Sequence, residues 1–286
     1  MSDPFPAWFL SALAAVTVCS IMFGIGLGTT PRELLSVWRR PGVTLRALFA
    51  VLLAVPAMAW AVCLALDLPR AVSVGIMLMA IAPGAPLALR RSLDAGGHHA
   101  FAPGLQISVL LLAVVSMPLS VAVINHVYGT HGSLSPLHLM KQVVTVQLLP
   151  LGLGVASGWL LPRAAAWLRP RLERLGKLLL LLLLAYLAFA FRDDLSRAGT
   201  GMVLAMVMIT AGALGVGHVL GGPEPGTRSA VAVVSAARNL GLALLTATLN
   251  AAPAAVTAVL PVYIFVSAIT MLPYILWRGR RGPPGA

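Results

Sequence analysis

Apolar stretches of about 20 residues recur from one end of this sequence to the other. Hydrophobic residues occupy 59% of the 286 positions, and charged residues occupy only 10%. A helix needs about 20 apolar residues to cross the roughly 30 Å hydrocarbon core of a bilayer. The pattern therefore predicts an all-α membrane protein that forms a single integral membrane domain over residues 1–286, without a separate soluble domain.

On this length rule we expect nine transmembrane helices. They are expected at residues 7–28, 44–66, 71–90, 104–126, 139–162, 176–192, 200–219, 228–250 and 254–277. Within the fifth of these spans, Gly152, Gly154 and Gly158 favour close helix packing, and Gln147 is a helix contact or a site residue.

The basic residues between the spans are distributed unequally over the two sides of the membrane. One side carries fifteen of the 20, namely Arg32, Arg39, Arg40, Arg46, Arg90, Arg91, Arg163, Arg169, Arg171, Arg174, Lys177, Arg228, Arg278, Arg280 and Arg281. The other side carries Arg70, Lys141, Arg192 and Arg197. The excess predicts that the first side is cytoplasmic, with the N-terminus outside and the C-terminus in the cytoplasm. The net charge of +12 is then an orientation signal, and we expect no nucleic-acid partner.

Two spans are interrupted near their middles, one in each half of the chain. The run APGAP at 82–86 should unwind the span 71–90, because proline removes a helical donor and clashes with the preceding turn. The run ARNLG at 237–241 interrupts the span 228–250. At 1.5 Å per residue, both interruptions lie about 15 to 18 Å deep, at the level of the bilayer midplane.

Paired interruptions of this kind are typical of a transporter binding site, because broken backbone at membrane depth lines a cavity or is buried in protein. Each half-helix that starts at an interruption presents free N–H groups that favour an anion. The candidate substrate-binding residues are therefore Pro83, Gly84, Ala85, Ser235, Arg238 and Asn239.

Arg238 is the only basic residue expected near the middle of a span, where an arginine costs about 2.5–3.5 kcal/mol. All eight acids fall in expected loops or termini, so no span supplies a carboxylate partner. A substrate anion is the counter-charge that we expect, held bidentately by the guanidinium. Two alternatives stay open. The guanidinium could replace a bound cation, or it could bond carbonyl groups of the broken helix or extend to the cytoplasmic side.

Several short motifs resemble the bile acid:sodium symporters. Met22-Phe23-Gly24-Ile25-Gly26-Leu27 is similar to a stretch at the end of a family helix, and Ala82-Pro83-Gly84 stands at the family's first helix break. Asn239-x-Gly241-Leu242-Ala243, followed by Ala252-Pro253, resembles the second. The resemblance implies inverted repeats, here about 7–126 and 139–277, a core and a panel domain, and two discontinuous helices that cross at the midplane. It also implies a bacterial inner-membrane location.

The resemblance also implies where sodium ligands would lie, and this sequence departs from the pattern there. The family's glutamate position falls on Val234 and its glutamine position on Arg238, while a serine-asparagine pair falls on Ala88 and Leu89. Sodium needs several oxygen ligands and a compensating carboxylate. We therefore expect degenerate sodium sites, no metal site, no cofactor and no family-type sodium coupling.

The leading hypothesis is a secondary transporter that moves a small organic anion by alternating access. Two alternatives are a sodium-coupled carrier of bile acid-like molecules and a non-transporting relative that binds a lipid or a sterol. An intramembrane enzyme is not expected, because the sequence contains no H-E-x-x-H, no G-x-S-x-G and no pair of aspartates within the spans.

Overall fold

The computed structural model describes residues 7–30, 35–85, 87–128, 136–192, 199–249 and 252–280, all of them in helices or their connections. Pro86, which was expected to contribute to the first interruption, lies outside these ranges. The all-helical fold expected from the apolar pattern is confirmed.

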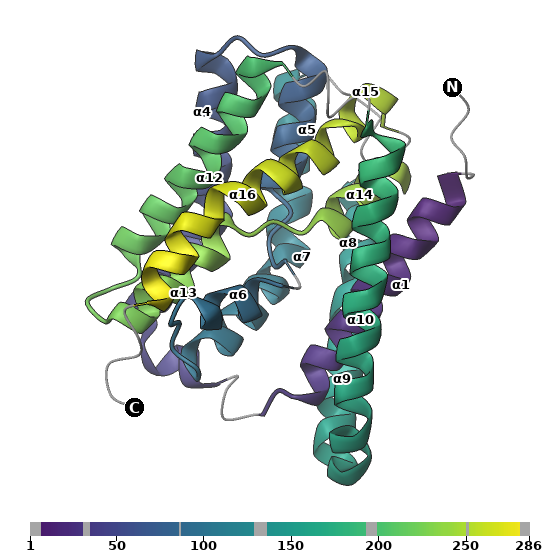
Figure 1. The fold of residues 1–286 in the computed structure, drawn as a ribbon, viewed down its shortest axis with the longest axis vertical. Coiled ribbons are helices and arrows are strands. Elements are labelled where there is room, and N and C mark those ends of the chain that lie inside the picture. The colour runs from purple at the N-terminus through teal and green to yellow at the C-terminus, as the bar shows by residue number, and fades with distance from the viewer. Residues whose placement is uncertain are drawn as a thin grey trace.

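The helices follow one another in the order of the expected spans (Figure 1). They are α1 (Ala7–Leu27), η1 (Val37–Arg39), α3 (Pro41–Phe49), η2 (Ala50–Ala54), α4 (Val55–Ala65), α5 (Arg70–Ala80), α6 (Ala88–Asp94), α7 (Phe101–Tyr128), α8 (Pro136–Val143), η3 (Val144–Leu148), α9 (Leu149–Leu160), α10 (Pro162–Ala190), α12 (Thr200–Leu220), α13 (Pro225–Ala236), α14 (Leu240–Leu249), α15 (Ala254–Thr257) and α16 (Val259–Gly279).

Seven helical stretches among the described residues are long and apolar enough to cross a membrane, against the nine expected. The stretch expected at 71–90 is not among the seven, because its helix α5 has only 11 residues before the chain unwinds. The stretch expected at 176–192 is not among them either. It lies within α10, where Glu173, Arg174 and Lys177 leave an uncharged segment of only 13 residues, 178–190.

Helix α10 also begins much earlier than expected. Residues 163–175 were expected to form a loop, but they are helical from Pro162 onward. Proline is favoured at the first helical position, and the arginine, leucine and alanine residues that follow are good helix formers. Glu173, expected in a loop, therefore lies on the helix and forms an ion pair with Arg169 one turn away.

The helices form two groups (Figure 1). The peripheral group consists of α1, α8, η3, α9 and α10, and the central group consists of α3, η2, α4 to α7, and α12 to α16. Helices α1 and α9 approach closely through glycines, because a Cβ on Gly26 would lie 2.3 Å from the Leu151 carbonyl oxygen. A Cβ on Gly154 would lie 2.3 Å from the Phe23 carbonyl oxygen. The packing role expected for Gly154 and Gly158 is confirmed, and Gly26 of the Met22–Leu27 motif has the same role. The packing role expected for Gly152 is wrong, because a Cβ there would meet no atom within 4 Å.

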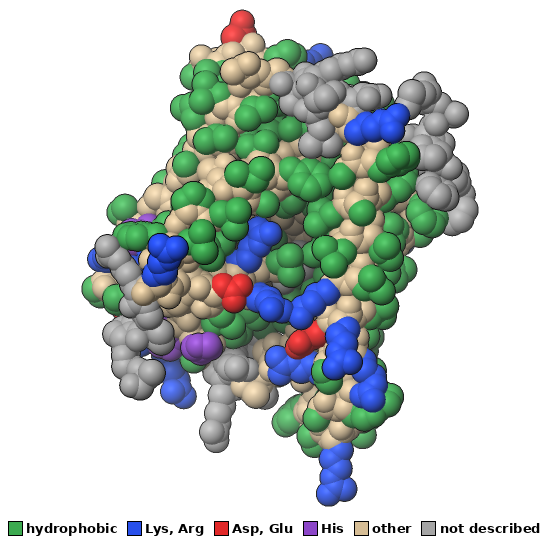
Figure 2. Space-filling model, in the orientation of Figure 1, with side chains coloured by type: hydrophobic (Ala, Val, Ile, Leu, Met, Phe, Trp, Pro, Cys, Tyr) green, Lys and Arg blue, Asp and Glu red, His purple; other side chains and the backbone are tan. Residues whose placement is uncertain are grey.

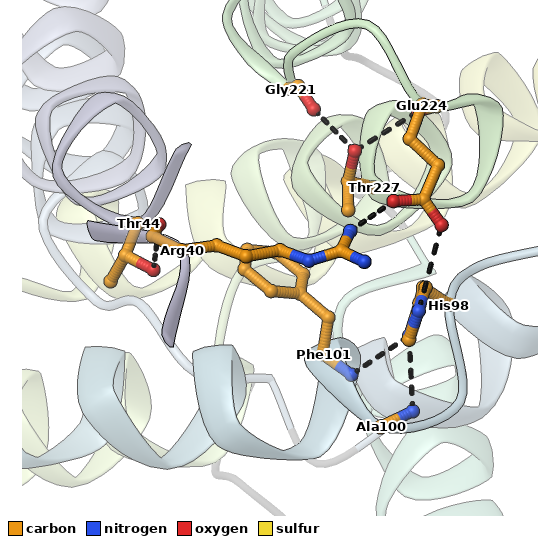
Figure 3. A network of polar contacts seen from close by, with 8 residues as sticks. All are labelled: Arg40, Thr44, His98, Ala100, Phe101, Gly221, Glu224 and Thr227. Carbon is orange, nitrogen blue, oxygen red and sulfur yellow. Dashed lines mark hydrogen bonds and ion pairs between the residues drawn. The ribbon is translucent and has the colours of Figure 1, made fainter. Parts of the chain in front are cut away.

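Three helix starts of the central group are tied together by a polar network (Figure 3). Glu224, which precedes α13, pairs with Arg40 before α3 and lies 3.5 Å from Nε2 of His98, which precedes α7. His98 Nδ1 accepts the backbone N–H groups of Ala100 and Phe101, which leaves Nε2 as the nitrogen that faces Glu224. These side chains are partly exposed, so each pair alone contributes little to the stability of the fold. Together, the contacts join three loops of the central group.

Candidate functional site

The two interruptions lie against each other at the centre of the molecule. The backbone N–H of Asn239 donates to the Ala82 carbonyl at 2.9 Å, which joins the second interruption to the first. Residues 229–247, which contain the second interruption, are all buried inside the protein. The fold therefore brings together the two segments that the sequence singled out, and it encloses the second one completely.

The first interruption is a non-helical segment between α5 and α6 that contains Pro83, Gly84 and Ala85. Gly84 adopts φ +77, a left-handed conformation that side chains disfavour. A Cβ at this position would also lie 2.5 Å from Leu110 Cδ2 on α7. The Ala85 carbonyl accepts a hydrogen bond from Gln106 Nε2 at 3.0 Å. The first interruption therefore offers backbone groups, and the surrounding helices supply their partners.

Asn239 connects both interruptions with the peripheral group. Its Oδ1 accepts the N–H of Leu242 at 3.1 Å, which caps the start of α14. Its Nδ2 donates to the Gly84 carbonyl at 3.3 Å and to Gln147 Oε1 at 3.2 Å. Gln147 lies in η3, so one side chain links α14, the first interruption and the peripheral group.

The Arg238 guanidinium is bound by backbone carbonyl groups. Its side chain is 2% exposed, Nη1 donates to Ala80 at 2.9 Å and to Val51 at 3.4 Å, and Nη2 donates to Ser235 at 2.5 Å. Ala80 ends α5, and Ser235 lies in the last turn of α13. Helix C-termini carry partial negative charge and unpaired carbonyls, which a cation stabilises. The geometry is the one described above as an alternative, in which the guanidinium bonds the ends of the broken helices.

The Val51 carbonyl is free to bind Arg238 because it lies in a π-helical segment. In a π-helix the carbonyl of residue i accepts the N–H of residue i+5, as Ala50 does from Val55 in η2. The corresponding donor for Val51 would be residue 56, which is proline and has no N–H. The Val51 carbonyl therefore lacks its helical partner, and Arg238 binds it.

A second π-helical segment, η3, is followed by Pro150 in the same relative position and contributes Gln147. Both π segments therefore contact the second interruption, a role that the sequence reasoning did not foresee. The sequence does contain a signal for these two segments. Pro56 and Pro150 both lie well inside expected spans, where a proline must disturb the helical hydrogen bonds.

Two adjoining cavities lie between the groups of helices. The inner cavity has a volume of about 70 Å³ and is lined by Ala85, Arg238 and Asn239 together with apolar side chains of α1, α10 and α16. The outer cavity has about 480 Å³ and lies between α1, α6 and α10. Leu87 lines both cavities.

The outer cavity has a basic rim. Arg90 on α6 faces it from the central group, and Lys177 and Arg169 on α10 face it from the peripheral group. Arg169 pairs with Glu173, whereas Arg90 and Lys177 form no ion pair within the part of the chain that the structure describes. Basic side chains gather on the face of the molecule between α6 and α10 (Figure 2). The arrangement favours a negatively charged group at this rim.

The remaining candidate positions are buried as well. Pro83 is buried in the first interruption, and the Ser235 hydroxyl has no hydrogen-bond partner among the described residues. Val234, where the family's glutamate position was expected from the sequence, is buried and apolar. Within the described ranges, no three His, Cys, Asp or Glu side chains form a group that could hold a metal ion.

Comparison with known families places this chain beside one group of membrane transporters. The model of the sodium bile acid symporter family matches residues 15–196. The matched part begins within α1, includes the first interruption and the helices α8 to α10, and ends before α12. A comparison with curated proteins finds no match.

Proposed function

The chain belongs to the sodium bile acid symporter family, a family of membrane transporters and not of enzymes, and we propose that it carries an organic anion without family-type sodium coupling. Membership implies secondary transport. The substrate class and the absence of sodium coupling are our proposal. In it, the central group corresponds to the family's core domain, the peripheral group corresponds to its panel domain, and the two move against each other.

The proposed architecture has nine spans in one domain, with inverted repeats at about 7–126 and 139–277 and two discontinuous helices that cross at the midplane. The contact between Ala82 and Asn239 supports the crossing, because it joins the two interruptions directly. The basic residues of the loops support a cytoplasmic C-terminus and an external N-terminus in a bacterial inner membrane. On this orientation, the outer cavity opens toward the cytoplasm.

The cavities support an anionic substrate. Arg90 and Lys177 place positive charge on both sides of the outer cavity, one on each group of helices. Apolar side chains such as Ile21, Ile25 and Leu172 line the same space. An anion with an apolar body would place its charge at the basic rim, where partial dehydration strengthens the attraction. Arg238 lines the inner cavity and adds a fixed positive charge deeper inside.

The observation that carries the sodium-independent mechanism is the bonding of Arg238. Its guanidinium neutralises carbonyl oxygens at the ends of both α5 and α13, which is the electrostatic task of a bound cation. Sodium would need oxygen ligands and a carboxylate at the crossing. The position expected for that carboxylate is Val234, and Arg238 already supplies the positive charge.

The test is uptake by the purified protein in proteoliposomes. A panel of labelled organic anions would be offered with an inward sodium gradient and with potassium in its place. We expect saturable uptake that is equal in the two salts. Sodium-dependent accumulation would refute the proposal and favour the sodium-coupled alternative. Saturable binding without flux of any anion would favour the non-transporting lipid- or sterol-binding alternative.

A further inference from the structure

The hairpin formed by α9 and α10 extends beyond the other helices at the lower end of the molecule (Figure 1). Helix α10 has 29 residues, which corresponds to about 43 Å, whereas the hydrocarbon core is about 30 Å thick. Its uncharged segment, 178–190, accounts for only about 20 Å. Residues 158–174, the hairpin tip, therefore reach the level of the lipid headgroups on the proposed cytoplasmic side.

The hairpin tip exposes large apolar side chains. Trp159 is 75% exposed, Leu160 73%, Leu161 61% and Trp167 60%. These residues surround the turn between α9 and α10, so they form one apolar end of the hairpin. Tryptophan at this level is typical of the membrane interface, where the ring contacts both acyl chains and headgroups.

Basic residues surround this apolar end. Arg163, Arg169, Arg171 and Arg174 all lie on the first half of α10, and Glu173 is the single acid among them. Glu173 pairs with Arg169, so the other three arginines keep their charge available. Arg171 lies 3.7 Å from the ring centre of Trp167, which combines a cation and an apolar ring in one surface.

A cavity of about 320 Å³ adjoins this surface, between the end of α1 and the turn of the hairpin. It is lined by Gly28, Thr29, Trp159 and Arg169, among others. Arg169 also lines the outer cavity of the candidate site. The same side chain of the hairpin tip therefore lines both this cavity and the outer cavity.

From this combination we propose that the hairpin tip binds anionic phospholipid of the cytoplasmic leaflet. Phosphate groups would contact Arg163, Arg171 and Arg174, and the tryptophan rings would enter the upper part of the acyl region. A lipid surface supplies both the negative charge and the apolar contact that this tip requires. The proposal rests on the orientation given under the proposed function, but not on transport itself.

The experiment measures lipid binding to the full-length protein in neutral phosphatidylcholine nanodiscs. Brominated phosphatidylglycerol is added, and quenching of tryptophan fluorescence reports its approach. Each basic residue near an anionic surface contributes about 1 kcal/mol, or roughly fivefold, so Arg163→Gln/Arg171→Gln/Arg174→Gln should weaken binding about 100-fold. The matched control, Arg39→Gln/Arg46→Gln/Arg280→Gln, removes three arginines on the same side and should bind as the wild type does.

A second variant tests the apolar contact without a change of charge. Trp159→Phe/Trp167→Phe should lower the amplitude of the quenching, because these rings approach the brominated chains. The four remaining tryptophans still report binding, and the affinity read from them should fall only a few-fold. Size-exclusion profiles establish that each variant is folded. Equal affinity of the tip variant and its control would overturn the proposal. Loss of anion transport with intact phosphatidylglycerol binding would instead count against the proposed function alone.

Discussion

The two helix interruptions are held open in different ways. The first contains Pro83 and Gly84, which prevent a regular helix through their own backbone chemistry. The second consists of Ala237, Arg238 and Asn239, none of which is a strong helix breaker. It is maintained by bonds to other segments, above all the Asn239 N–H bond to Ala82. The first interruption is therefore local in origin, and the second depends on the first.

The difference extends to what each interruption offers to its surroundings. The first presents carbonyl groups, which Gln106 and Asn239 satisfy from outside. The second presents the side chains of Arg238 and Asn239, which satisfy carbonyls elsewhere. Stability should therefore depend on side chains in the second interruption and on backbone conformation in the first.

The largest effect is expected from Arg238→Met. The change leaves the carbonyls of Ala80, Val51 and Ser235 without their donor in a buried site, which should cost about 3–5 kcal/mol of unfolding free energy. Arg238→Lys keeps the charge but not the planar guanidinium, so the stability of this variant should lie between those of the wild type and Arg238→Met. Denaturant unfolding in detergent measures both. A methionine variant as stable as the wild type would mean that the second interruption does not depend on this side chain.

An intermediate effect is expected from Gly84→Ala. Alanine at this position would have to adopt φ +77, and its methyl group would clash with Leu110. Together the two effects should lower the unfolding free energy by about 1–3 kcal/mol. Gly152→Ala is the matched control, since a Cβ there meets no atom within 4 Å. That variant should gain up to about 1 kcal/mol through helix propensity. Thermal unfolding compares the two, and equal shifts would contradict a conformational role for Gly84.

The smallest effect is expected from Ser235→Ala. Ser235 bonds Arg238 through its backbone carbonyl, and its hydroxyl has no partner among the described residues. Removing an unpaired hydroxyl from this buried position should leave the unfolding free energy unchanged or raise it, by about 1 kcal/mol at most. A larger loss of anion affinity than of stability would show that the hydroxyl contacts the substrate directly.

Seven of the nine expected spans could be predicted from apolar length alone. The first interruption could be predicted from Pro83 and Gly84, and the second from the polar residues Arg238 and Asn239 inside an apolar run. The partners of the interruptions could not be predicted. Val51 and Gln147 are separated from Arg238 and Asn239 by about 90 to 190 residues, so only the assembled fold brings them together. The guanidinium was expected to await a substrate anion, because a sequence displays carboxylates but not unpaired carbonyls.

The start of α10 shows the opposite error. A run of charged residues was expected to form a loop because it is too polar for the membrane. Helix formation and membrane insertion are separate properties, however. Residues 162–177 form a helix, but their charged side chains disfavour insertion into the membrane. The result is a long helix with a charged half and an apolar half.

The fixed guanidinium of Arg238 has an energetic consequence on the sodium-independent mechanism. Its positive charge belongs to the protein and does not travel with the substrate. An anion that crosses alone experiences the full electrical potential, and 100 mV, negative inside, changes its free energy by about 2.3 kcal/mol, a roughly 50-fold ratio. In an energised cell this voltage drives the anion outward, so such a carrier would work as an exporter.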